Sequence, residues 1–166
     1  MPARTPIRRM TERETLPEDA SSTWWRLLDE AADLAEGYRD RGWTATVVHP
    51  GDVTPVNTDD RFGLSVLAPD SEYDRVQSLA DSHTFDRSQV YRRVDDGVTY
   101  LVCVFETAGD NTALVVPAYA TETGLDLLYP RAQDVGEMEI HVRPLAHEER
   151  VALTVADPAP FFASEG

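Results

Sequence analysis

Lysine is absent from this chain, and all fifteen of its basic residues are arginine. This absence excludes a P-loop of the GxxxxGK[ST] type, a Schiff-base lysine and a Ser–Lys dyad. A GxSxG nucleophile elbow is missing as well, because Gly63-Leu64-Ser65 is not followed by the second glycine. Lysine-dependent catalysis is therefore excluded, and a serine hydrolase of this type is not expected.

Cysteine and long apolar segments are scarce. Cys103 is the single cysteine, so no disulfide can form within the chain. The longest apolar run, Ala113–Ala120, is interrupted by Pro117 and is too short to cross a membrane. Arg8-Arg9 would suit a twin-arginine export signal, but no apolar stretch follows it. We expect no membrane association and a location in the reducing cytoplasm.

Acidic residues outnumber basic residues by thirty to fifteen, which gives a formal net charge of −15. Residues 1–14 are the exception: they have four arginines, two glutamates and no hydrophobic periodicity, and we expect them to be disordered. The acidic remainder repels phosphate backbones, so we expect no binding to nucleic acid. An excess of carboxylates without lysine suits high intracellular salt, which screens self-repulsion. The composition therefore predicts a halophilic protein.

The first half of the chain predicts two helices and two strands. The first helix is expected to begin at Thr15, which has the spacing of a capping box with Glu18, and to end at Gly42. Its apolar stripe has steps of three and four residues and consists of Trp24, Leu28, Ala31, Ala35 and Tyr38. We expect strands over 43–49 and 62–67, a polar loop over 52–61 and a short helix over 69–80.

The second half predicts three consecutive strands over 84–94, 98–106 and 112–119. The first two are joined by Asp95-Asp96-Gly97, which is typical of a tight hairpin. Segment 121–136 stays open between helix and loop, because Pro130 interrupts an otherwise helical pattern of apolar residues. Two further strands are expected over 137–145 and 151–155.

These elements predict an α+β fold. We expect an antiparallel sheet, made of the three-strand meander plus flanking strands, with two or three helices packed mainly on one face. Residues 15–166 are expected to form a single domain, because neither a linker nor an internal repeat divides them. The Pro-rich segment that ends in Phe161-Phe162 is expected to fold back over the sheet as a strap.

Four stretches of the sequence stand out together: Trp24-Trp25 in the first helix, Ala113–Tyr119, His141–Leu145 and Asp157–Phe162. With these stretches the chain resembles a family of small uncharacterised haloarchaeal proteins of unknown function, over residues 16–162. The resemblance implies a cytoplasmic protein of a haloarchaeon. It implies no catalytic residue, ligand or cofactor.

One group of residues with metal-binding side chains consists of His141, His147 and Glu148. Their spacing matches neither an HExxH helix nor a zinc-finger pattern, and His141 is expected on a strand with His147 in the following turn. A hydrated acidic turn is the simpler interpretation of this group, so the metal site is the weaker hypothesis.

A second group consists of Asp52, Asp59 and Asp60, which lie in the predicted loop over 52–61. Carboxylates suit a hard cation, but the loop lacks the ligand spacing and the central glycine of an EF-hand. Cys103 lies among continuous apolar neighbours, which predicts an inert thiol in the core. We therefore expect neither a metal ion nor a cofactor.

Five residues are candidates for contact with a protein partner: Trp25, Arg92, Arg93, Phe161 and Phe162. The two arginines form the one basic pair in the acidic body, and strand alternation directs them to opposite faces. Trp25 lies beside the apolar stripe of the first helix, where it can reach an interface. The two phenylalanines either pack on the sheet or insert into a partner.

Two hypotheses about function follow. The first is a non-enzymatic interaction or regulatory module that forms a homodimer or binds another protein, because catalytic motifs are missing while aromatic residues and sheet edges are available. The second is a small metal- or acid/base-dependent enzyme that uses His141, His147 and the Asp52–Asp60 loop. The sequence does not identify a substrate or a partner.

Overall fold

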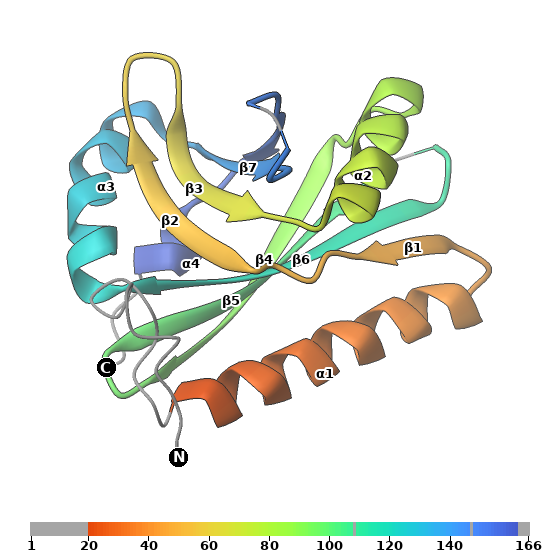
Figure 1. The fold of residues 1–166 in the computed structure, drawn as a ribbon, viewed down its shortest axis with the longest axis horizontal. Coiled ribbons are helices and arrows are strands. Elements are labelled where there is room, and N and C mark those ends of the chain that lie inside the picture. The colour runs from red at the N-terminus through yellow and green to blue at the C-terminus, as the bar shows by residue number, and fades with distance from the viewer. Residues whose placement is uncertain (1–19, 108, 147, 163–166) are drawn as a thin grey trace.

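A computed structural model describes residues 20–107, 109–146 and 148–162 of the chain (Figure 1). Its helices are α1 (Ala20–Asp40), α2 (Asp70–Ser82), α3 (Glu122–Val135) and α4 (Ala159–Phe162). Its strands are β1 (Thr44–Val47), β2 (Asp52–Asn57), β3 (Phe62–Leu67), β4 (Arg87–Asp95), β5 (Val98–Glu106), β6 (Thr112–Thr121), β7 (Met138–Arg143) and β8 (Val151–Val155). The expected capping box and the basic segment 1–14 lie outside the described residues.

The strands form two four-stranded sheets. Sheet A has the order β1-β6-β5-β4, and sheet B has the order β2-β3-β7-β8. The α+β class is confirmed, and so is the antiparallel meander of β4, β5 and β6. The single antiparallel sheet was wrong, because β1 pairs with β6 and β3 pairs with β7 in parallel. Both parallel pairs join strands that are far apart in the sequence, so no hairpin turn in the sequence predicts them.

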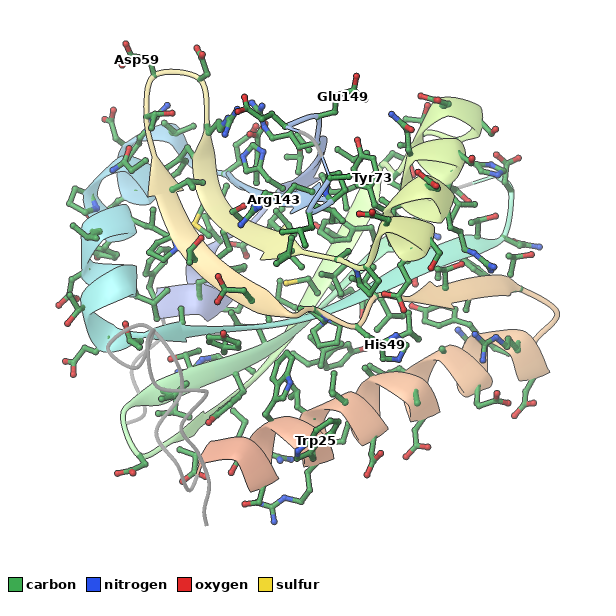
Figure 2. All side chains as sticks on the ribbon, in the orientation of Figure 1. Trp25, His49, Asp59, Tyr73, Arg143 and Glu149 are labelled. Atoms are coloured by element: carbon green, nitrogen blue, oxygen red, sulfur yellow. The ribbon has the colours of Figure 1, made fainter. Side chains whose placement is uncertain are left out.

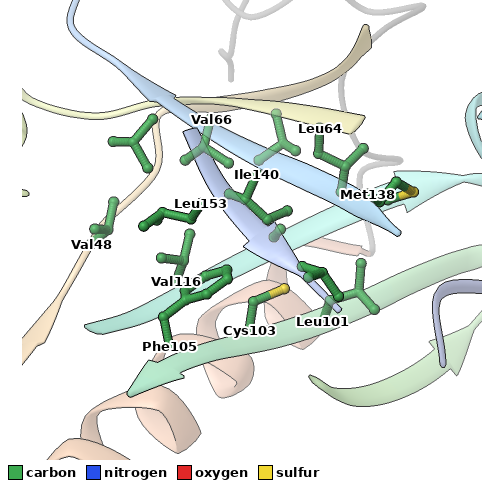
Figure 3. Close-up of a cluster of buried hydrophobic side chains, with 14 of the residues drawn as sticks. Val48, Leu64, Val66, Leu101, Cys103, Phe105, Val116, Met138, Ile140 and Leu153 are labelled. Atoms are coloured by element: carbon green, nitrogen blue, oxygen red, sulfur yellow. The ribbon is translucent and has the colours of Figure 1, made fainter. Parts of the chain in front are cut away.

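Sheet A lies between α1 and sheet B (Figure 1). One face of β5 presents Leu101, Cys103 and Phe105 to sheet B, as Figure 3 shows, while Tyr100 and Val102 face α1. Helices α2, α3 and α4 lie on the sheet B side of sheet A, and α1 covers its other face. Because both faces of sheet A are covered, β5 and β6 are apolar along most of their length.

Helix α1 packs on sheet A through a leucine, two alanines and a tyrosine. Leu27, Ala31 and Ala35 are buried, and Tyr38 donates a hydrogen bond from its hydroxyl to Glu106 of β5. Trp24 is half-buried and meets Tyr119 of β6 edge to face, with the ring centroids 5.3 Å apart. The predicted helix and its spacing are confirmed over the described residues, although the buried stripe is centred on Leu27 rather than on Leu28.

The predicted loop over 52–61 is mostly strand β2, which pairs with β3 in antiparallel fashion from Asp52↔Leu67 to Asn57↔Phe62. Pro55 and the polar residues around it led to the prediction of a loop, because proline is typical of turns. An outer strand tolerates proline, since the missing N–H is not needed on its open side. Only residues 58–61 form the turn.

Segment 121–136 is settled as a helix. Thr121 accepts a hydrogen bond from the backbone N–H of Gly124 at 3.1 Å, which caps the start of α3. Pro130 lies within the helix and is exposed, while Leu125, Leu128 and Ala132 are buried. Proline removes one backbone hydrogen bond, and the buried apolar face outweighs that loss.

Strands β3 and β7 approach each other so closely at Gly63 that only glycine fits there. The φ angle of Gly63 is +142°, and a Cβ atom at this position would overlap with the carbonyl group of Glu139. This contact belongs to the parallel pair that joins the two hairpins of sheet B. The close approach therefore helps to hold sheet B together.

We predict that Gly63→Ala lowers the free energy of unfolding by about 3 kcal/mol or more, because the backbone of β7 has to move. Gly51→Ala is the matched control, since the nearest atoms to its added Cβ lie at 4.0 Å, and we expect a change within about 0.5 kcal/mol. Urea denaturation in concentrated KCl measures both. Equal effects of the two substitutions would contradict this account of the β3–β7 contact.

Candidate interaction site

Strand β4 is an outer strand of sheet A and has nine residues. Exposed and half-buried side chains alternate along it without a break. The exposed positions are Arg87, Gln89, Tyr91, Arg93 and Asp95. An outer strand of this length presents a row of backbone groups and side chains that a second strand can pair with.

The exposed side chains of β4 are held by surface contacts. Arg87 Nη2 lies 3.2 Å from Glu106 Oε1, and Arg93 Nη2 lies 2.7 Å from Glu30 Oε2 on α1. Tyr91 remains 46% exposed, and its hydroxyl donates to Gln89 Oε1 at 2.8 Å. Solvent-exposed ion pairs contribute at most about 1 kcal/mol each, so these contacts order the side chains and still allow exchange with a partner.

Arg92 and Arg93 lie on opposite faces of β4. Arg93 contacts α1, whereas Arg92 lines a cavity of about 450 Å³ between the β4–β5 hairpin, α3 and α4. Phe161 and Phe162 line the same cavity. The fold thus brings together Arg92, Phe161 and Phe162, three of the residues that the sequence predicted to contact a partner, although Arg92 is far from the other two in the chain.

The aromatic residues at this cavity differ in accessibility. Phe161 is completely buried in the core, whereas Phe162 is half-buried and meets Tyr129 of α3 edge to face at 5.3 Å. Tyr129 is 45% exposed and has no counterpart among the candidates from the sequence. Trp25 lies elsewhere, 64% exposed on α1 (Figure 2).

His141 lies in the middle of β7 with only 1% of its surface exposed. Arg150 Nε donates a hydrogen bond to its Nδ1 atom at 3.0 Å, and Glu139 Oε1 lies 3.1 Å from its Nε2 atom. Ser65 stands opposite on β3 and accepts a hydrogen bond from Arg143 Nε at 3.0 Å. Because an arginine can only donate, the imidazole must carry its proton on Nε2.

Burial, together with the positive charges of Arg150 and Arg61, lowers the pKa of His141 to about 4. The imidazole is therefore neutral near pH 7. Its Nδ1 lone pair is already used by Arg150. The exposed Glu148 lies in the following segment, and His147, the other histidine of this group, lies outside the described residues.

No sequence motif connects the neighbours of His141. Glu139 and His141 are two residues apart and share one face of β7, which the sequence indicates, but Ser65 and Arg150 come from β3 and from the segment after β7. Their proximity depends on the parallel pairing of β3 with β7 and on the return of the chain into β8. The cluster was therefore not visible in the sequence.

The three aspartates of the predicted 52–61 loop do not meet. Asp52 begins β2 and accepts a hydrogen bond from the Tyr119 hydroxyl at 3.4 Å. Asp59 and Asp60 are exposed in the turn at the opposite end of the β2–β3 hairpin, where Figure 2 shows Asp59. In the part of the chain that the structure describes, no three His, Cys, Asp or Glu side chains gather as a metal site would require.

Cys103 is buried in the core, as its apolar neighbours predicted. Burial raises the pKa of its thiol to about 12, so the thiol stays protonated at neutral pH. A thiolate is the reactive form of cysteine. This side chain therefore contributes packing and not nucleophilic chemistry.

A sequence profile described as "Family of unknown function (DUF7529)" matches residues 11–163. The chain belongs to this family. The match confirms that the resemblance noted in the sequence is to a family of unknown function. No curated protein and no solved structure matches the chain. Among the residues described for this member of DUF7529, no helix is long and apolar enough to cross a membrane.

The state of His141 predicts how stability depends on pH. Its pKa of about 4 in the folded protein is below the ordinary value of 6.5, so below pH 6.5 the unfolded chain takes up a proton that the folded chain does not. The stability from neutral His141 is complete above pH 6.5 and is lost as the pH falls toward 4.

Between pH 7 and pH 5, the wild type should lose on the order of 2 kcal/mol more free energy of unfolding than His141→Gln, which cannot titrate. Urea denaturation of both proteins at several pH values measures the difference. All other titrating groups are common to the two proteins and cancel in the comparison. Parallel curves would show that His141 does not resist protonation in the folded state.

Proposed function

We propose that the protein is a non-enzymatic interaction module, and that it associates with a second copy of itself through strand β4. The observation that carries this proposal is the combination of length, position and charge in β4. It is a nine-residue outer strand, and it contains three arginines and one aspartate in a chain whose net charge is −15.

The other outer strands are less suitable for pairing. β1 has four residues and β8 has five, so each offers only half of the backbone of β4. β2 contains Pro55, which lacks a donor, and α3 packs against it with Gly124 next to the proline ring, a more extensive contact than the one between α4 and β4. Short strands, proline and a covering helix are the usual ways in which a sheet edge is protected from pairing.

Charge favours the same strand. Two bodies with a large negative charge repel each other, and this repulsion is weakest where the contacting surfaces carry the fewest carboxylates. β4 carries an excess of positive charge, so contact between two β4 strands places no net negative charge in the interface. Concentrated salt screens the repulsion of the remaining surfaces, since the Debye length is about 3 Å at 1 M.

The proposal includes the environment. We propose that the protein belongs to a haloarchaeon and works in its cytoplasm at high salt. The support is the composition: thirty acidic residues, fifteen arginines and no lysine. In dilute solution the same composition would strain the fold through self-repulsion.

Light scattering in about 2 M KCl tests the association, and we expect a mass of about twice 18.5 kDa. Tyr91→Asp should dissociate the dimer, because it buries a charge at the centre of the contact. Trp25→Asp, at an exposed position on α1, should leave it intact. A monomeric wild type would contradict the proposal, and dissociation by Trp25→Asp alone would place the interface on α1.

Dilution of salt tests the environment. We expect cooperative unfolding when KCl falls from about 2 M to about 0.1 M, where the Debye length rises to about 10 Å. Circular dichroism at constant protein concentration follows the transition. A protein that stays equally folded at low salt would contradict halophilic adaptation. The proposal of association through β4 would be unaffected, because light scattering tests it separately.

A further inference from the structure

The β4–β5 hairpin determines which backbone groups of β4 face outward. Its turn consists of Asp96 and Gly97, with φ angles of 55° and 81°, and Asp95 pairs with Val98 across it. The residues that flank a two-residue turn of this kind form a hydrogen-bonded pair, and such pairs then alternate along the ladder. Arg93, Tyr91, Gln89 and Arg87 therefore bond to β5.

The peptide groups of the intervening residues point to the outer side of sheet A. These residues are Ser88, Val90, Arg92 and Val94. The backbone N–H of Ala156 donates to Ser88 at its hydroxyl and not at its peptide oxygen, with an N–O distance of 3.2 Å. A second strand that pairs with β4 has to bond to this outward row.

We infer that two copies of the chain pair their β4 strands in antiparallel fashion about a two-fold axis through Tyr91, which deepens the proposed function and rests on it. In this register the outward residues bond to one another, Ser88 to Val94 and Val90 to Arg92 of the second copy. On the α1 side, Arg87 lies opposite Asp95 of the second copy. Two attractive contacts between opposite charges result, one on each side of the axis.

Neighbouring registers bring like charges together. If the axis passes through Val90, then Arg87 of one copy lies opposite Arg93 of the other. An axis through Arg92 or through Arg93 places that arginine opposite itself. Like charges directly opposite each other destabilise a strand pair. An axis through Gln89 or Val94 avoids them but aligns only residues 87–91 or 93–95 of the two strands, so charge and strand length together select the register centred on Tyr91.

Tyr91 suits the position on the axis. In this register the two Tyr91 residues form a pair that is not hydrogen-bonded, in which the Cα atoms approach to about 4.5 Å and the side chains lie closest. The 46% of Tyr91 that is exposed would then be covered by the same residue of the second copy. Aromatic pairs across strands are among the stabilising ones.

Cysteine cross-linking of the full chain tests the register in about 2 M KCl. Tyr91→Cys should form a covalent dimer under mild oxidation, because its Cα separation falls within the range for a disulfide. Gln89→Cys and Arg93→Cys should each stay uncross-linked alone, since identical residues would lie about 13 Å apart. A mixture of these two proteins should cross-link, because Gln89 lies opposite Arg93 of the second copy.

The mixture leaves Tyr91 in place, so it tests the register even if Tyr91→Cys weakens association. Native Cys103 is buried and protonated and does not interfere. Two outcomes would overturn the inference in a chain that light scattering shows to be dimeric. One is a cross-link formed by Arg93→Cys alone, and the other is no cross-link from either Tyr91→Cys or the mixture. Both would leave the proposed association standing. A monomeric wild type would remove both.

Discussion

Strands β5 and β6 lose contact with water on both faces, because α1 covers one face of sheet A and sheet B covers the other. Each fully buried aliphatic or aromatic side chain contributes about 1.5–3 kcal/mol, so these strands supply much of the apolar burial of the domain. The rest of the structure is arranged around them. Sheet B is joined by the close contact of β3 with β7 at Gly63, and α3 and α4 lie together at one end of the two sheets, with α2 at the other.

The two outer strands of sheet A differ in how far they expose backbone groups to pairing with another strand. β1 is short, whereas β4 is long, alternating and rich in arginine. Charged residues on an edge discourage random pairing, and in the register that we propose for two β4 strands opposite charges lie across from each other. Under this proposal the same residues both discourage aggregation and specify one partner.

His141 has a structural role, although histidine can also bind metals and transfer protons. Its ring is buried between two strands, one nitrogen accepts from Arg150, and the other lies beside Glu139. Burial and the charges of Arg150 and Arg61 lower its pKa and keep the ring neutral, so the cluster resists protonation. Cys103 is committed in the same way, with its thiol protonated in the core. The chemistry that these two side chains offer is thus used for packing.

The sequence by itself determined the features that depend on neighbours in the chain. Periodicity predicted α1, and Asp95-Asp96-Gly97 predicted the β4–β5 hairpin, because helical stripes and tight turns are local. Only the tertiary structure decided the two sheets, since the parallel partners of β1 and β3 lie far along the chain. For the same reason it alone decided that Asp52 and Asp59 lie apart, that Ser65 and Arg150 meet around His141, and that Arg92 and Phe162 share a cavity. Contacts between distant segments depend on the packing of whole layers, and no local pattern encodes them.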